Sequence, residues 1–226
     1  ANYFLQELGN GNLPVGIRLK DKKEVLLTML ALIKAGKTIL PLPYEIPEDK
    51  VSVIVANICP QAIISEQELA MNHIHNCTFI ALEKLQQLKD IQDHHIEVDY
   101  HNENIFCILM TSGTTGIPKG CQLSDYAFLG RIADLAEYFP MAVGDKFLFS
   151  GNYSFDVTFT QMFCWLFGEG SIVIQSANDK FNKIPQYVEQ FNITHIAISP
   201  SILRHIYENI HKDDTSLKYV FVAGEK

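Results

Sequence analysis

The hydrophobic positions along this chain of 226 residues follow two alternating spacings. Short runs rich in β-branched and aromatic residues predict strands, and helix-length amphipathic segments lie between them. This alternation from end to end is typical of mostly parallel sheets flanked by helices, so the predicted fold class is α/β. The expected strands lie near residues 38–43, 61–64, 78–80, 105–110, 171–174, 194–199 and 219–223.

Three helices have clear signals at their first residues. Asp21, with Glu24 three positions on, predicts a capped helix that is apolar nearly all round and ends at Gly36, so we expect it to be buried. Ser124 can cap a second helix, and we expect a third to follow Asp156. The second helix has a single apolar stripe formed by Phe128, Ile132, Leu135 and Phe139.

A change from polar to apolar residues near residue 102 predicts a boundary between two lobes. The polar stretch 93–104 gives way to a continuous apolar run at 105–110, which is typical of a central strand covered on both faces. We therefore expect a first α/β lobe at residues 1–101, incomplete at its N-terminus, and a second at 102–226, incomplete at its C-terminus.

Composition and charge exclude several classes of function. The formal net charge of −8, without basic clusters, disfavours a nucleic-acid partner, because that partner requires Lys and Arg to replace its counterions. No apolar run is long enough to span a membrane, and the first residues lack the order of a signal peptide. We expect a cytoplasmic protein with neither a membrane nor a nucleic acid as its partner.

Histidine and cysteine positions do not form a recognisable metal site. For the pairs His73 and His75, and His94 and His95, no Cys, Asp or Glu completes a recognisable ligand set, and the five cysteines show no CxxC spacing. No metal-ligating residue is predicted.

The apolar run at 105–110 leads into a segment of small residues and hydroxyls that one lysine closes. Glycines let backbone N–H groups approach an anion, hydroxyls donate to phosphate oxygens, and a lysine adds positive charge. Ligands of open α/β sheets also bind beyond the carboxyl ends of strands. The alternative is a surface turn rich in Gly and Thr. The predicted phosphate-binding residues are Thr111, Ser112, Gly113, Thr114, Thr115, Gly116 and Lys119.

This segment resembles the phosphate-loop signature of the adenylate-forming superfamily, and it lacks the spacing of a Walker loop. That superfamily includes acyl-CoA synthetases, luciferases, D-alanine–carrier protein ligases and nonribosomal peptide synthetase adenylation domains. Two further segments are similar to the family in the same order: residues 32–36 with 40–42 to its LKAG and VP segment, and residues 222–225 to its GGE segment. The resemblance therefore covers the whole chain.

Residues 152–158 separate the branches of the family. They resemble the FDxS element of amino-acid-activating members, with Thr158 where serine is usual, and the resemblance implies that Asp156 pairs with the α-ammonium group of the substrate. A substrate without the amine would leave that carboxylate unpaired. The alternative is that Asp156 only caps the helix that follows it.

The resemblance also implies further site residues. Thr115 and Lys119 would be catalytic, and Gly224 and Glu225 would lie near the adenine. The side-chain pocket would include Val157, Thr160, Ala197, Phe221 and Ala223, although a core position would explain each of them equally well.

The implied reaction is adenylation of an amino acid. Its carboxylate would attack the α-phosphorus of ATP, accompanied by Mg²⁺, to give aminoacyl-AMP and pyrophosphate. A carrier protein's phosphopantetheine thiol would then take the aminoacyl group. The resemblance implies that the ribose-binding aspartate and the C-terminal lysine lie beyond Lys226, so we expect this chain alone to be an inactive fragment. Two alternatives stay open: an acyl- or aryl-acid ligase, and a non-catalytic adenylation-like interaction domain.

Overall fold

The computed structural model describes residues 1–69, 77–88, 104–111, 118–210 and 215–224, and it confirms the α/β class. The chain forms two compact units, Ala1–Phe128 and Leu129–Lys226. Among the described residues, no helix has both the length and the apolar character that crossing a membrane requires.

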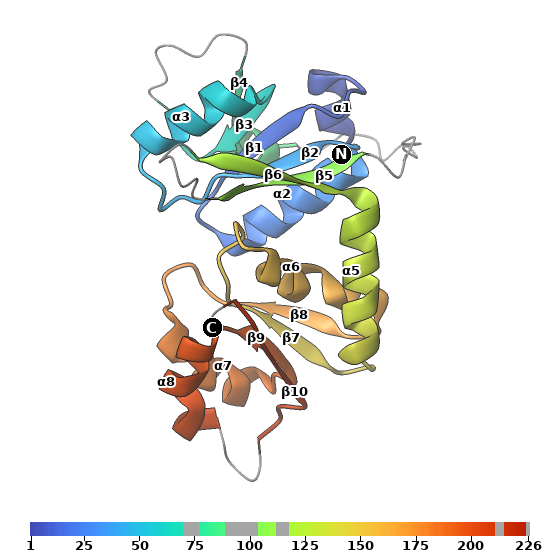
Figure 1. The fold of residues 1–226 in the computed structure, drawn as a ribbon, viewed down its shortest axis with the longest axis vertical. Helices are drawn as coiled ribbons and strands as arrows, with labels where there is room; N and C mark the ends of the chain where they lie inside the picture. The colour runs from blue at the N-terminus through green and yellow to red at the C-terminus, as the bar shows by residue number, and fades with distance from the viewer. Residues whose placement is uncertain (70–76, 89–103, 112–117, 211–214, 225–226) are drawn as a thin grey trace. The chain divides into compact units, whose positions relative to one another are not determined.

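The first unit contains a six-stranded sheet in the order β4-β3-β1-β2-β5-β6 (Figure 1). All neighbouring strands are parallel except β5 and β6, which are antiparallel. Its elements are α1 (Asn2–Leu8), β1 (Pro14–Arg18), α2 (Lys22–Lys34), β2 (Thr38–Pro41), α3 (Glu48–Ile58), β3 (Ala62–Ser65), β4 (Thr78–Ala81), α4 (Leu82–Gln86), β5 (Ile105–Thr111) and β6 (Lys119–Ser124).

In the first unit, α2 begins at the cap that the sequence predicted. The Asp21 carboxylate accepts the backbone N–H groups of Lys23 and Glu24 at 2.8 and 3.2 Å. The expectation that α2 is buried all round is wrong at Leu27, which is 51% exposed. α3 packs its buried Val51, Ile54 and Val55 against Leu40 of β2, Leu42 just after β2 and Ile63 of β3.

The second unit contains a four-stranded, fully parallel sheet in the order β10-β9-β7-β8. The long helix α5 (Asp125–Tyr138) begins in the first unit, where Ser124 Oγ accepts the N–H of Ala127 at 3.2 Å as predicted. The other elements are β7 (Lys146–Phe149), α6 (Asp156–Phe163), the 3₁₀ helix η1 (Cys164–Phe167), β8 (Ser171–Ile174), the 3₁₀ helix η2 (Phe181–Lys183), α7 (Ile184–Phe191), β9 (His195–Ile198), α8 (Pro200–Ile210) and β10 (Tyr219–Val222).

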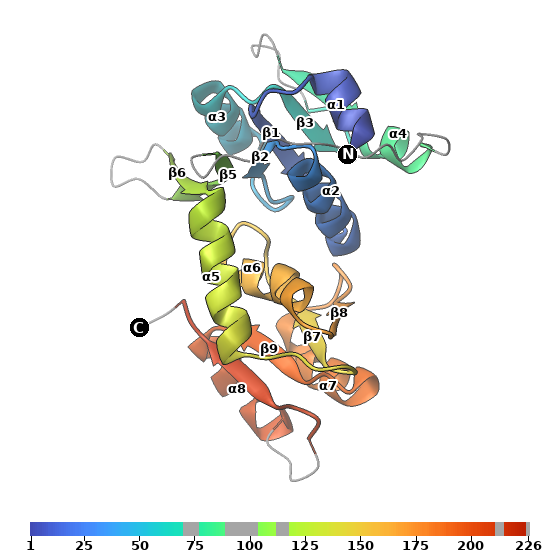
Figure 2. The ribbon, with the colours of Figure 1, turned by 90° about the vertical axis from the view of Figure 1, so that its right-hand side faces the viewer.

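Helices cover both faces of this second sheet (Figures 1 and 2). On one face, Leu148 of β7 and Ile196 and Ile198 of β9 pack against buried residues of α7 and α8. α6 lies over the other face and contacts β7 and β9. Alternate residues of β7 and β9 therefore belong to two different cores, as the period of a strand requires.

The two compact units divide at a different place from the predicted lobes. β5 pairs with β2 of the first sheet and β6 pairs with β5, so residues 104–128 join the first unit. The expected lobes at 1–101 and 102–226 concern a complete adenylation domain and stay a prediction, and residues 89–103 lie outside the described part of the chain.

Several titratable groups meet at the amino ends of β7, β9 and β10. The ammonium of Lys218 lies 2.6 Å from the buried carboxylate of Asp145. Nδ1 of the buried His195 lies 2.7 Å from Thr194 Oγ1, and its ring stacks on Tyr219. Burial lowers the pKa of His195 below its usual 6.5, although the charge of Asp145 and the Pro140 carbonyl raise it.

This shift in the pKa of His195 predicts how stability changes with pH. Since the unfolded chain binds the proton at a higher pH than the folded chain does, the free energy of unfolding should decrease as pH falls below about 6.5. In His195→Phe, which keeps an aromatic ring beside Tyr219, this contribution should disappear.

Urea unfolding between pH 7.5 and 5.5 measures the effect. His205, which is exposed on α8, supplies the matched control variant His205→Phe, and this variant should keep the wild-type slope. An unchanged slope in His195→Phe would show that His195 does not contribute to the pH dependence.

Candidate functional site

The structure places both ends of the predicted phosphate-binding segment on one β-ribbon. Thr111 is the last residue of β5 and Lys119 the first residue of β6, and the two form a cross-strand pair. Thr111 Oγ1 donates to the Lys119 carbonyl at 3.2 Å, and both residues are exposed. Thr111 and Lys119 therefore flank the same loop, so the hydroxyl of one precedes it and the ammonium of the other follows it.

Residues 112–117, between these ends, lie outside the described part of the chain. They include five predicted phosphate-binding residues, which stay predictions: Ser112, Gly113, Thr114, Thr115 and Gly116.

The second sheet contains a switch in strand order at the carboxyl ends of β7 and β9. From β7 the chain crosses through α6 to β8 on one side, then returns through α7 to β9 on the other side of β7. α6 and α8 thus leave neighbouring strands toward opposite faces of the sheet. In open α/β sheets such a point leaves a crevice where ligands bind.

Asp156 is the first residue of α6, so it lies beyond the carboxyl end of β7. Its side chain is exposed, and its Oδ1 accepts the N–H of Val157 at 2.8 Å. Phe155, which makes no side-chain capping bond, occupies the N-cap position. The carboxylate therefore satisfies one N–H of the helix terminus while its other oxygen stays available for a cation.

The predicted pocket positions come from α6, β9 and β10. Thr160 and Ala197 are each 2% exposed, and Val157 is half-buried. Ala197 pairs with Phe221 across the two strands. The ring of Phe221 packs edge-on to Phe139, with 5.3 Å between centroids, so this side chain also belongs to the core.

The predicted adenine-binding positions follow β10. The N–H of Ala223 donates to the Ile198 carbonyl at 3.2 Å, which extends the β9–β10 pairing by one residue. Gly224 has φ +97°, a conformation that favours glycine. Glu225 lies outside the described residues.

Gln161 belongs to no predicted site, yet it connects the two sides of this switch point. Its Oε1 accepts the N–H groups of Ser150 and Gly151 at 2.9 and 2.8 Å. Its Nε2 donates to the Ala197 carbonyl at 2.5 Å. A buried glutamine in a helix that directly follows a strand was the available signal.

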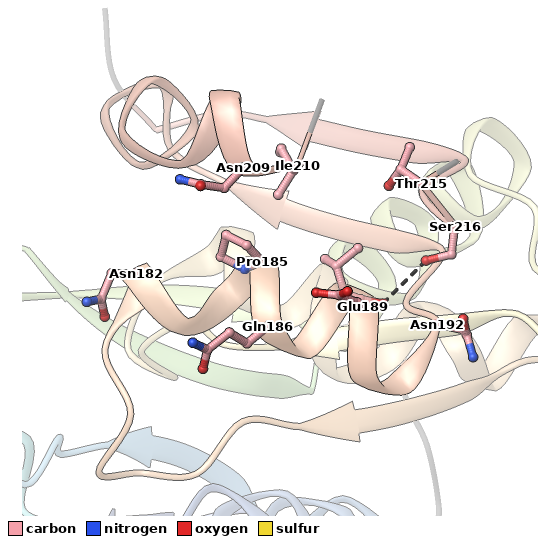
Figure 3. Close-up of a pocket in the computed structure, with 10 residues that line it drawn as sticks. Asn182, Pro185, Gln186, Glu189, Asn192, Asn209, Ile210, Thr215 and Ser216 are labelled. Atoms are coloured by element: carbon pink, nitrogen blue, oxygen red, sulfur yellow. Dashed lines mark hydrogen bonds between the residues drawn. The ribbon is translucent and has the colours of Figure 1, made fainter. Parts of the chain in front are cut away.

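A hollow of about 510 Å³ opens elsewhere in the second unit, between α7 and α8 (Figure 3). Most of its polar lining consists of uncharged amides and hydroxyls, and Glu189 adds a negative charge. It contains none of the predicted site residues.

Over the described ranges of the chain, no group of three or more His, Cys, Asp or Glu side chains could hold a metal ion. The histidines at 73, 75, 94 and 95 lie outside those ranges.

Two curated relatives match nearly the whole chain. Polyketide synthase PksN of Bacillus subtilis is 28% identical over 229 residues, with 94% of this chain covered. Gramicidin S synthase 2 of Brevibacillus brevis is 25% identical over 231 residues, with 99% covered. The chain spans only 4% of the length of the first relative and 5% of the length of the second.

A solved structure has the same fold. The N-terminal subdomain of Klebsiella oxytoca NpsA, in complex with 3-hydroxyanthranilyl-AMSN, matches with a TM-score of 0.83 over 99% of this chain and 56% of that one. Their sequence identity is 20%, so this likeness concerns the fold alone.

The family model described as "AMP-binding enzyme" matches residues 1–226, and this range includes the ribbon of Thr111 and Lys119, the turn that leads to Asp156, and the end of β10. The chain therefore belongs to the family of AMP-binding, adenylate-forming enzymes.

Proposed function

We propose that the protein containing this chain activates an amino acid as aminoacyl-AMP and releases pyrophosphate. The observation that supports this choice is the exposed carboxylate of Asp156 at the switch point of the second sheet. A carboxylate in that position can accept a charge-assisted hydrogen bond from an α-ammonium group. A fatty or aryl acid without an amine would leave the carboxylate unpaired in a closed pocket.

The pocket positions favour a small or apolar side chain on the substrate. Val157, Ala197 and Ala223 bring no charge, and Thr160 brings one hydroxyl. A charged substrate side chain would lose its hydration there without gaining a partner from these residues. Asp156 would recognise the amine, and these positions would recognise the side chain. The two contributions to specificity would be independent.

In the proposed reaction, the amino-acid carboxylate forms a bond to the α-phosphorus of ATP, and the bond from that phosphorus to the bridging oxygen of pyrophosphate breaks. Lys119 and the hydroxyls and N–H groups of residues 111–116 would bind the β- and γ-phosphates and stabilise the charge that pyrophosphate carries away. Mg²⁺ would enter with ATP, since it binds phosphate oxygens and keeps several waters. Gly224 and Glu225 would approach the adenine.

We further propose that a carrier protein takes the aminoacyl group. The thiol of its phosphopantetheine arm would attack the aminoacyl carbonyl carbon, form a thioester and release AMP. The relatives support this step because they include a polyketide synthase and a gramicidin synthase.

An acyl- or aryl-acid ligase is the second candidate. One observation favours it: the Asp156 carboxylate already accepts the N–H of Val157. ATP–pyrophosphate exchange by the full-length protein separates the candidates. Exchange that aryl or fatty acids support, and amino acids do not, would select the second candidate.

The proposed phosphate loop predicts that Lys119→Ala and Thr115→Ala each reduce amino-acid-dependent pyrophosphate exchange by about 100-fold, the usual scale for one lost donor to a developing charge. The exposed Lys119 makes no apolar core, so stability to urea should not change for Lys119→Ala. Lys50→Ala, which removes an exposed lysine of α3, is the matched control and should keep wild-type exchange. Wild-type rates in both loop variants would refute the assignment.

The proposed role of Asp156 predicts a loss of selectivity in Asp156→Asn. Asparagine keeps the shape and can still accept the N–H of Val157, but it presents no negative charge to the ammonium. Truncating one partner of a buried charge pair costs about 2 kcal/mol or more, and because Asp156 is exposed we expect the lower end, about a thirtyfold loss of exchange.

The readout is the ratio of exchange with the cognate amino acid to exchange with its deaminated analogue. This ratio should fall in Asp156→Asn and stay unchanged in Asp134→Asn, which alters an exposed aspartate of α5. Equal ratios in wild type and Asp156→Asn would mean that Asp156 does not recognise the amine.

A further inference from the structure

We propose that Gln161 is a positioning residue for substrate selection. Its buried amide fixes the turn that leads from β7 to Asp156 and ties that turn to β9, which carries Ala197. The inference rests on the proposed activation of amino acids, and it assigns to Gln161 the task of setting the spacing between the ammonium site and the side-chain pocket.

The three bonds of Gln161 join segments that are far apart in sequence. Ser150 and Gly151 directly follow β7, whereas Ala197 lies 36 residues beyond Gln161 on the neighbouring strand. The amide group therefore spans the switch point between the ends of β7 and β9. The sheet pairs these two strands at only one position, Phe147 with His195, toward their amino ends. The hydrogen bonds of the Gln161 side chain therefore connect β7 to β9 near their carboxyl ends, beyond the position where the strands pair.

A primary amide satisfies all three partners without any change of protonation. Two backbone N–H groups need an acceptor, and the Ala197 carbonyl needs a donor, so the two ends of the side chain must differ in polarity. Gln161 is 2% exposed, and losing any of these bonds would leave a buried polar group without its partner. Glutamate would keep the two acceptor bonds but would set an oxygen against the Ala197 carbonyl. Methionine would keep the length of the side chain and lose all three bonds.

Hydrogen bonds within the turn between Gly151 and Asp156 link the position of Gly151 to that of Asp156. Asn152 Oδ1 accepts the N–H and the hydroxyl of Ser154 at 3.0 and 2.9 Å. The N–H of Phe155 then donates to the Asn152 carbonyl at 3.2 Å. These hydrogen bonds leave the turn little conformational freedom. A displacement of Gly151 would therefore displace Asp156 as well.

Gly151 also lies too close to α6 for any larger residue. A Cβ atom at this position would overlap Thr158 Oγ1 and would come within 3.2 Å of Gln161 Oε1. The turn is therefore held against the helix by close packing on one side and by the amide of Gln161 on the other.

A matched pair of glutamines makes the proposal testable. Gln175, at the end of β8, is 1% exposed, and its Nε2 donates to the Lys180 carbonyl at 3.0 Å. It resembles Gln161 in burial and chemistry but belongs to a different strand end. The variants to compare in the full-length protein are Gln161→Met, Gln161→Glu and the control Gln175→Met.

In Gln161→Met we expect the ratio of exchange with the cognate amino acid to exchange with its deaminated analogue to fall about tenfold, because small misplacements of binding groups are costly. KM for the amino acid should rise, while KM for ATP should change less than about twofold. Gln161→Glu should recover part of the ratio because it keeps the bonds to Ser150 and Gly151. Gln175→Met should leave the ratio as in wild type, even if it lowers stability.

Hydrogen exchange at the amides of Ser150 and Gly151 gives a readout that does not depend on activity. Both amides should exchange faster in Gln161→Met and stay protected in Gln161→Glu and Gln175→Met. If the substrate ratio in Gln161→Met changes no more than in Gln175→Met, Gln161 is a structural residue only and the inference is overturned. A wild-type enzyme that activates no amino acid would instead refute the proposed function.

Discussion

The parallel pairing of β7 with β9 is the constraint on which the arrangement of the second unit depends. The chain reaches β9 only after it has visited β8 on the other side of β7, so the connections that leave β7 and β9 must diverge to opposite faces. That divergence leaves the first residues of α6 and the residues after β9 at one edge of the sheet, without a helix packed directly between the two strand ends. Asp156 owes its exposure beyond β7 to this topology.

Much of the fold followed from the sequence, because burial imposes a period on local segments. The caps at Asp21 and Ser124 and the strands at 62–65, 171–174 and 195–198 lie where apolar runs and polar boundaries predicted them. Three strands, β1, β6 and β7, were not predicted. β6 has a glycine, a glutamine and exposed positions, so its pairing with β5 is a tertiary property. β7 is as short as β3, β8 and β9, and its apolar residues 147–149 carried the same signal as theirs.

The candidate site also contains residues that the local sequence predicts and one residue that it does not. The positions of Asp156 and Lys119 near strand ends could be predicted because both belong to contiguous motifs. Gln161 could not, because its importance comes from Ser150 and Ala197, which approach it only after the sheet has formed. A residue defined by contacts between distant segments leaves no local pattern apart from its polarity among apolar neighbours such as Met162 and Phe163. The division of the compact units after Phe128 is likewise a tertiary property, since it depends on which sheet accepts β5.

The bond from Gln161 to β9 ends on a backbone oxygen, and this has a consequence for redesigning the enzyme. A main-chain carbonyl is present whatever residue occupies position 197. The methyl group of Ala197 could therefore be exchanged for another small side chain to reshape the pocket while the tie across the strand ends is kept. A grafted specificity segment should consequently carry Gly151 through Gln161 as one cassette, whereas position 197 can be varied by itself.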